Sequence, residues 1–243
     1  MNIAAIIQAR MGSTRLPGKV FMDLEGEPML VRVVNRVERA AALDSVIVAT
    51  TVEPADDPIA EFCAARGWPC FRGSQDDVLD RYYNTAVVHK VDAAVRVTSD
   101  CPLIEPVIID RVVERFRRDQ AKIDYVTNSR LMPLTFPRGL DTELMSFEAL
   151  KRTWTEAKDP SEQEHVTLYI YRHPEMFKIC KLDNDVDCSY MRWAVDTKED
   201  LEFVRNIYNY FGHDRFSFPQ VLAVLKQHPE WLEINKHIQQ KEV

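Results

Sequence analysis

The 243-residue sequence is poor in glycine, so each glycine is informative. It has seven, fewer than the ~7 % of residues usual in proteins: Gly12, Gly18, Gly26, Gly67, Gly73, Gly139 and Gly212. Its five cysteines include no CxxC pair, which argues against a structural zinc site and favours small, reduced, hydrophobic-like side chains. No apolar run approaches 18 residues, so no transmembrane helix is expected.

The sequence predicts no secretory signal, and its overall charge is not basic. Its first ten residues have no basic n-region and no small-residue cleavage site, so we expect a cytoplasmic protein without a membrane partner. Its net charge of −7 argues against nucleic acid as the main partner, because binding phosphates by counterion release needs a basic face. With 46 % apolar and 28 % charged residues, the composition is typical of a globular protein.

Hydrophobic patterns alternate between those of strands and helices. Strands are expected at residues 3–7, 45–51, 70–71, 92–98, 123–127, 177–182 and 191–195. Helices are expected at 28–43, 57–66, 76–90, 106–118, 146–157, 161–172 and from 198 onward. This order predicts a three-layer α/β/α fold with a mostly parallel sheet. We expect a single domain, 1–243, in which residues 128–190 leave the sheet to bind an acceptor or pair subunits.

The loop after the first strand combines positive charge with small residues. Residues 1–20 carry Arg10, Arg15 and Lys19 but no acid. Gly12 and Gly18 let the backbone turn and approach a ligand closely, and the loop adds the hydroxyls of Ser13 and Thr14. Backbone amides with three cations suit a polyphosphate. The spacing differs from the Walker A and GxGxxG motifs, and a solvated basic turn is the alternative.

The loop, QARMGSTRLPGK at 8–19, closely resembles the opening of the sugar cytidylyltransferases, a family that includes CMP-Kdo and CMP-sialic acid synthetases. The resemblance is strongest to the branch of spore-coat polysaccharide biosynthesis protein F, and it extends to about residue 208. It continues through GEPML at 26–30, FRGSQDDVLDRYY at 71–83, RVTSDCPLI at 96–104, FPRGLD at 136–141, EHVT at 164–167 and RWAVDT at 192–197. Gln8 and Ser99 depart from the sialic acid and Kdo members, which usually have Pro, and Gly or Thr, at these positions.

The resemblance implies a nucleotidyltransferase that moves CMP from CTP to a sugar acid of the 2-keto-3-deoxy or nonulosonic type. Pyrophosphate would be released, and the product would serve surface polysaccharide biosynthesis. It further implies a homodimer and Mg²⁺ as cofactor. Catalysis would fall to Arg10, Lys19 and Asp100. The implied nucleotide-binding residues are Ala9, Arg10, Gly12, Ser13, Thr14, Arg15, Lys19, Arg72, Gly73, Ser74, Thr98 and Ser99.

Two acids follow expected strands, Asp100 after residues 92–98 and Asp196 after residues 191–195. Carboxylates that reach one sheet edge from separate strands form a hard oxygen site suited to Mg²⁺. Both match the metal-binding acids of the family. The alternative for each is a cap on the following helix.

The acceptor is expected under residues 128–190, where the polar candidates are Asn128, Arg138, Asp141, Glu164 and His165. Arg138 suits a carboxylate or phosphate. A satisfied, partly buried histidine is the alternative for His165. Arg81 fits either a surface charge or a side chain facing the substrate.

Other activities remain open at this point. A related transferase would use another nucleotide, or a phosphosugar or phosphonate acceptor. A glycosyltransferase would need an Asp-x-Asp motif, and only 183–185 and 185–187 fit that spacing. A non-catalytic nucleotide-binding protein would not need the acids and cations together.

Overall fold

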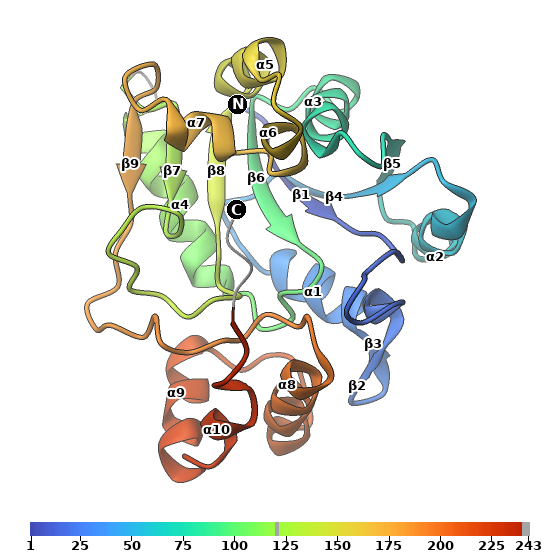
Figure 1. Ribbon diagram of the computed structural model, residues 1–243, viewed down its shortest axis with the longest axis vertical. Coiled ribbons are helices and arrows are strands. Elements are labelled where there is room, and N and C mark those ends of the chain that lie inside the picture. Colours follow the sequence, from blue (N-terminus) through green and yellow to red (C-terminus); the bar gives the residue numbers. More distant parts are fainter. Residues whose placement is uncertain (120–121, 240–243) are drawn as a thin grey trace.

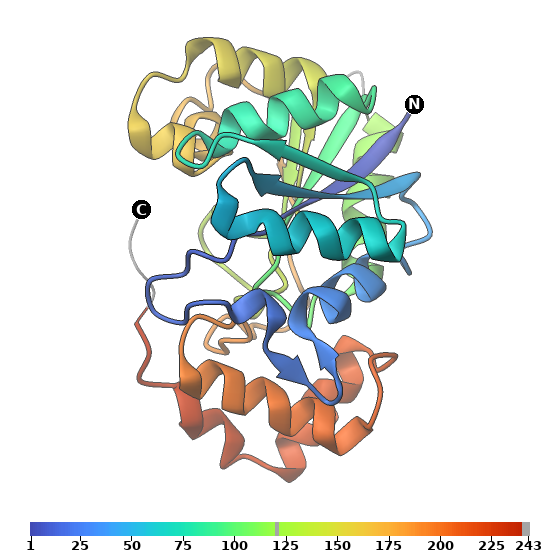
Figure 2. The same ribbon diagram turned by 90° about the vertical axis from the view of Figure 1, so that its right-hand side faces the viewer.

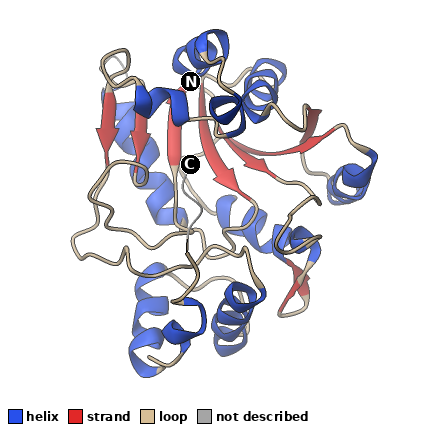
Figure 3. Cartoon of the chain, viewed as in Figure 1, coloured by secondary structure: helices blue, strands red, loops and turns tan. Residues whose placement is uncertain are grey.

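The computed structural model describes residues 1–119 and 122–239 and centres on a seven-stranded sheet (Figures 1 and 3). In spatial order the strands are β5 (Cys70–Gly73), β4 (Ser45–Thr51), β1 (Ile3–Gln8), β6 (Ala93–Thr98), β8 (Glu143–Ser146), β7 (Tyr125–Thr127) and β9 (Ile179–Lys181). β8 runs antiparallel to both of its neighbours, while the other pairings are parallel. The predicted mostly parallel sheet is therefore confirmed.

Helices cover both faces of this sheet and form a layer at one end. They are α1 (Met29–Val37), α2 (Asp57–Arg66), α3 (Val78–Val88), α4 (Pro106–Asp119), α5 (Phe147–Glu156), α6 (Pro160–Glu164), α7 (Leu168–Arg172), α8 (Lys198–Phe211), α9 (Phe218–Gln227) and α10 (Trp231–Asn235). Short elements complete the fold: the 3₁₀ helices η1 (Lys19–Phe21) and η2 (Pro54–Asp56), and the hairpin of β2 (Asp23–Leu24) and β3 (Glu27–Pro28). Among the described helices, none has the length and apolar character needed to cross a membrane.

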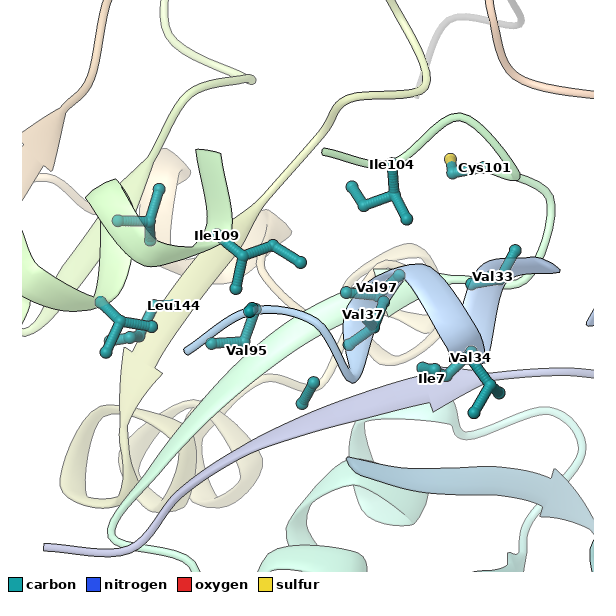
Figure 4. Close-up of a cluster of buried hydrophobic side chains, with 14 of the residues drawn as sticks. Ile7, Val33, Val34, Val37, Val95, Val97, Cys101, Ile104, Ile109 and Leu144 are labelled. Carbon is teal, nitrogen blue, oxygen red and sulfur yellow. The ribbon is translucent and has the colours of Figure 1, made fainter. Parts of the chain in front are cut away.

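Strand β1 shows why the sheet is buried on both faces. Its odd residues, such as Ile7, pack into a cluster with α1, α2 and α4, which Figure 4 shows in close-up. Its even residues, such as Ile6, pack with α3, α5 and α7. Because side chains alternate along a strand, a continuous apolar run supplies both cores.

The third core lies beyond the sheet, under the C-terminal helices (orange to red in Figure 2). Here Trp193, fully buried, packs with residues of α8 and α9. Helix α8 begins with a capping box in which Thr197 and Asp200 satisfy each other's backbone N–H groups. This layer packs against the first loop, whose Leu16 belongs to the same core.

The prediction that residues 128–190 leave the sheet is wrong in part. Strand β8 lies between β6 and β7, and β9 pairs with β7. The segment ELMS at 143–146 is too short to show a clear period, and its position beside β6 is a long-range pairing that sequence pattern does not reveal.

Two further expectations need correction. Residues 191–195 form no strand; the segment crosses below the sheet and makes one isolated bridge, between Arg138 and Arg192. The helix expected over 161–172 is divided into α6 and α7. Between them the hydroxyl of Thr167 donates to the buried carboxylate of Glu143, an attachment that the apolar pattern does not show.

The segment around Gly139 packs tightly against Trp193 and Ala194. Gly139 has φ +105°, and a Cβ there would lie 2.6 Å from the Ala194 nitrogen and from the Trp193 carbonyl carbon. We predict that Gly139→Ala lowers the free energy of unfolding by about 3 kcal/mol, from left-handed backbone strain plus overpacking. Urea denaturation measures this loss.

Gly67→Ala is the matched control, because Gly67 also has a positive φ, +69°, but no atom lies within 4 Å of the position that a methyl group would take. We therefore expect Gly67→Ala to lower the free energy of unfolding only by the backbone strain, about 1 kcal/mol. Equal losses in the two variants would show that the contact with Trp193 and Ala194 is not tight.

Candidate active site

A cavity of about 400 Å³ lies at the carboxyl ends of β1 and β6. This is where ligands bind in open α/β sheets. The cavity is lined by the first loop, the start of α3, the loops after β6 and β7, the residues between α6 and α7, and the segment before α8. Its cationic side chains are Arg10, Arg15, Lys19, Arg81, Arg96, Arg130 and Arg138.

The first loop is held in place through its backbone. The Met11 carbonyl accepts hydrogen bonds from the amides of Ser13 (2.9 Å) and Gly18 (3.0 Å), which closes the loop on itself. Gly18 has φ +68°, a conformation that favours glycine. The Met11 amide donates to the buried carboxylate of Asp56 at 2.6 Å, and the Thr51 hydroxyl donates to the same carboxylate. The end of β4 therefore anchors the loop.

Lys19 is the centre of the cavity's charge network. Its ammonium nitrogen lies 2.8 Å from an Asp100 oxygen, 3.0 Å from an Asp196 oxygen and 2.8 Å from the Val195 carbonyl. The Lys19 side chain is only 11 % exposed. The two carboxylates predicted to share a site are therefore brought together around one buried cation.

The ion pairs outweigh the effect of burial on the pKa values. Burial alone disfavours the charged forms of Lys19 and Asp100. The charges and hydrogen bonds between them nevertheless raise the pKa of Lys19 and hold the pKa of Asp100 well below its usual range. The pKa of Asp196 is also lowered: burial and Asp100 oppose this, but Lys19 and Arg15 outweigh them. All three groups are charged at neutral pH.

Helix capping does not explain the two acids. Thr197, not Asp196, is the N-cap of α8, and Asp100 lies well before α4 with an oxygen on Lys19. Asp196 also binds Arg15 at 2.9 Å and Arg192 at 2.6 Å. The Val195 amide donates to the Asp100 carbonyl at 2.8 Å, so a direct backbone contact, not a strand, brings Asp196 to Asp100.

The acid pair fits Mg²⁺ in its donor chemistry. Within residues 1–119 and 122–239, no group of three or more His, Cys, Asp or Glu side chains could hold a metal. Mg²⁺, however, is usually bound by one or two carboxylates together with phosphate oxygens and water. Asp100 and Asp196 provide two carboxylates, both within reach of the same ammonium group.

Most of the predicted nucleotide residues line the cavity. They are Ala9, Arg10, Ser13, Thr14, Arg15, Lys19, Thr98 and Ser99. Gly12, Arg72, Gly73 and Ser74 do not line it, so their roles stay predictions. Arg72 pairs instead with Asp57 at 2.6 Å. A Cβ at Gly73 would lie 3.1 Å from the Arg81 side chain, so this glycine makes room for Arg81.

Four of the five acceptor candidates also line the cavity: Arg138, Asp141, Glu164 and His165. Burial, Arg96 and Arg130 lower the pKa of His165, although Glu164 opposes them, so its imidazole is neutral at pH 7. Asn128 lies outside this cavity. Its side chain binds the Leu140 carbonyl and the Thr142 amide, and it lines an adjoining cavity of about 920 Å³.

Several lining residues were not predicted as site residues. They are Gln8, Val78, Arg81, Arg96, Cys101, Arg130 and Ala194. A signal existed for Arg96, a charged residue inside the apolar strand run AAVRVT. Arg81 is buried at 1 % exposure and faces the cavity, which decides between the two alternatives for it. Nothing in the sequence indicates a role for Arg130, because residues 128–141 form irregular turns without a hydrophobic period.

The Asp-x-Asp stretches lie away from this cavity. Asp183 pairs with Lys181 at 2.6 Å, and neither Asp185 nor Asp187 lines the cavity. The cavity therefore lacks the Asp-x-Asp metal-binding motif that a glycosyltransferase would need.

Fold and cavity together are those of a nucleotidyltransferase, with a cationic loop facing an acid pair. Residues 4–238 match the family model described as cytidylyltransferase. The chain belongs to this family and is an enzyme of the cytidylyltransferase type.

Individual relatives support the same family membership. The chain is 33 % identical to a cytidylyltransferase structure from Leptospira borgpetersenii, with a TM-score of 0.91 and full coverage of both chains. It is 31 % identical to spore coat polysaccharide biosynthesis protein SpsF of Bacillus subtilis, over 94 % of this chain and 96 % of the relative. It is 29 % identical to 3-deoxy-manno-octulosonate cytidylyltransferase of Geobacter sulfurreducens, over 86 % and 88 %.

The Lys19 network leads to a stability prediction. Lys19→Met leaves the partly buried Asp100 without its counter-ion, so the free energy of unfolding at pH 7 is expected to fall by about 2 kcal/mol. Without Lys19, burial raises the pKa of Asp100 above its ordinary value near 4, so the folded variant takes up a proton there as pH falls from 7 towards 4, and the cost of the missing counter-ion falls with it. The loss in Lys19→Met should therefore shrink between pH 7 and pH 4 in urea titrations.

Lys151→Met is the control, since Lys151 is exposed on α5. It should change stability by less than about 0.5 kcal/mol at either pH. A loss in Lys19→Met that stays constant from pH 7 to pH 4 would contradict the assigned pairing with Asp100.

Proposed function

We propose that this enzyme transfers CMP from CTP to a hydroxyl of a sugar acid and releases pyrophosphate, with Mg²⁺ as cofactor. The observation that carries the proposal is the buried Lys19 ammonium between Asp100 and Asp196, at the end of a loop that contains no acid. Cations that could bind a triphosphate therefore lie next to carboxylates that could bind its metal ion, which supports the proposal.

The first loop would hold the triphosphate. Within the described part of the chain, the Arg10 side chain lines the cavity but makes no ion pair or hydrogen bond, so its guanidinium is available to phosphate oxygens. Arg15 and Lys19 are already paired with acids, and binding of a polyanion would redistribute those pairs. Charge stabilisation at the departing pyrophosphate is the contribution expected from all three cations.

Asp100 and Asp196 would bind Mg²⁺ together with phosphate oxygens. The bound ion would neutralise charge on the triphosphate and polarise it. The chain's own part is to hold both carboxylates ionised and fixed, which their lowered pKa values and their contacts with Lys19, Arg15 and Arg192 support.

The acceptor would lie next to Arg138, Asp141, Glu164 and His165, which line the cavity. A guanidinium suits an acid group, and carboxylates with a neutral imidazole suit sugar hydroxyls. The name of the Geobacter sulfurreducens relative contains such a sugar acid, and that of the Bacillus subtilis relative indicates polysaccharide biosynthesis. The proposal extends to a cytoplasmic homodimer that works on polysaccharide precursors.

Pyrophosphate release with each of four nucleoside triphosphates and a panel of sugar acids tests the proposal. We expect release from CTP with a sugar acid and Mg²⁺, and loss of release when EDTA removes the metal. Release from another triphosphate alone, or hydrolysis of UDP-sugars without release from CTP, would contradict the proposed donor.

Asp100→Asn tests the metal assignment. The amide keeps the shape but loses the charge, so Mg²⁺-dependent turnover should fall by at least about a hundredfold, the usual scale for one electrostatic group. Asp185→Asn is the control, because Asp185 is exposed and outside the cavity, and it should retain full turnover. Wild-type turnover in Asp100→Asn would refute the assignment.

A further inference from the structure

A buried carboxylate, Glu143, lies behind the acceptor side of the cavity. Glu143 on β8 is directly opposite Arg96 on β6 in the antiparallel register. Its side chain is 1 % exposed. One oxygen lies 2.5 Å from Arg96 Nη1; the other accepts from the Thr167 hydroxyl at 2.7 Å and from the Tyr125 hydroxyl, and lies 3.7 Å from Arg130 Nε.

Two guanidinium groups therefore share one carboxylate. Arg96 and Arg130 both line the cavity, whereas Glu143 does not. Burial alone would raise the pKa of Glu143, but Arg96 and Arg130 lower it to about 2, so the carboxylate is ionised. The Nε atoms of Arg96 and Arg130 are buried without a hydrogen-bond partner. We call the part of the cavity surface formed by Arg96 and Arg130 the acceptor wall. With Glu143 behind it, this wall keeps one uncompensated positive charge, and the two Nε–H groups have no acceptor.

Other charged groups line the cavity as well: Arg138 and Asp141 have opposite charges, and Glu164 lies next to the neutral His165. The one positive charge that Arg96, Arg130 and Glu143 carry together matches a ligand with one negative charge.

Stability of the fold alone does not account for this arrangement. A buried ion pair is usually no more stabilising than well-packed apolar residues of similar volume. Arg130 also adopts φ +71°, a left-handed conformation that costs a residue with a Cβ about 1–2 kcal/mol. Strained backbone that is kept next to a cavity is typical of functional sites.

We propose that Glu143 sets the charge of the acceptor wall and thereby the acceptor class. By compensating one of the two arginines, it leaves a single positive charge, which selects an acceptor with a carboxylate over one with a doubly charged phosphate or phosphonate. Glu143 acts through Arg96 and Arg130 and is a positioning residue. The inference rests on the proposed transfer to a sugar acid.

Three forms of one sugar test the proposal: 3-deoxy-manno-octulosonate, its primary amide and the analogue with a phosphonate in place of the carboxylate. Pyrophosphate release with CTP at pH 8 gives kcat and KM for each. Wild type should prefer the carboxylate. In Glu143→Gln, the ratio of kcat/KM for phosphonate over carboxylate should rise on the order of tenfold, mainly through KM, because the wall gains one positive charge.

Charge-matched variants separate this effect from general damage. Arg96→Gln combined with Glu143→Gln removes one charge of each sign, so the ratio should return to the wild-type value even if the rate falls. Arg96→Gln alone should lower kcat/KM for the carboxylate about tenfold relative to the amide. Glu162→Gln, which breaks the nearby pair with Arg172 outside the cavity, should leave rate and ratio unchanged.

Three outcomes would contradict the role proposed for Glu143. An unchanged ratio in Glu143→Gln, or the same ratio in it and in the double variant, would overturn the proposal. A tenfold loss of CTP affinity in Glu143→Gln, measured by calorimetry, would assign the wall to the nucleotide and overturn it as well. If Glu143→Gln does not fold, the carboxylate-to-amide ratio of Arg96→Gln decides instead: an unchanged ratio there would overturn the proposal, and the tenfold fall would support it.

Failure of the proposed function can be distinguished from failure of the role proposed for Glu143. Wild-type enzyme that releases no pyrophosphate with any of the three sugars would refute the proposed acceptor. Calorimetric titration of the CTP-loaded protein with the carboxylate and phosphonate forms then tests the wall alone. The same change of preference in Glu143→Gln would support the charge assignment, and absence of binding would refute it.

Discussion

A buried ammonium group needs carboxylates around it, and this requirement organises the active end of the molecule. Lys19 begins η1 at the end of the first loop, Asp100 follows β6, and Asp196 precedes α8. Their contacts of 2.8 and 3.0 Å join three segments that are distant in the sequence. Removing Lys19 leaves Asp100 without its counter-ion and next to the like charge of Asp196. The loop, the sheet edge and the C-terminal layer are thus held in one arrangement.

The same constraint suits catalysis. A polyphosphate brings negative charge to a loop that already has Arg10 available and Arg15 and Lys19 within reach. The acid pair remains ionised in its absence, so little rearrangement of charge states is needed on binding. Preorganised charge of this kind is where much of the rate enhancement of phosphoryl transfer arises.

The proposed acceptor side depends on β8, the strand of the seven-stranded sheet that runs antiparallel to its neighbours. Strand β8 lies antiparallel beside β6 and brings Glu143 opposite Arg96. Thr167, between α6 and α7, donates to the same carboxylate, which fixes the turn that carries His165. This buried acid therefore attaches the turn between α6 and α7 to the sheet, and the loop after β7 contributes Arg130 and Arg138 to the cavity.

Local patterns in the sequence are enough to predict the alternation of strands and helices, and to single out the basic first loop and the two acids that the structure brings next to it. These patterns are β-branched runs such as 45–51, a basic loop with two glycines, and acids placed directly after periodic segments. The folded chain was needed to show that Asp196 reaches Asp100 without a strand, that Arg72 turns away to Asp57, and that Glu143 lies behind Arg96 and Arg130. The physical reason is that strand pairing and buried ion pairs join residues tens of positions apart, and hydrophobic periodicity contains no information about such partners.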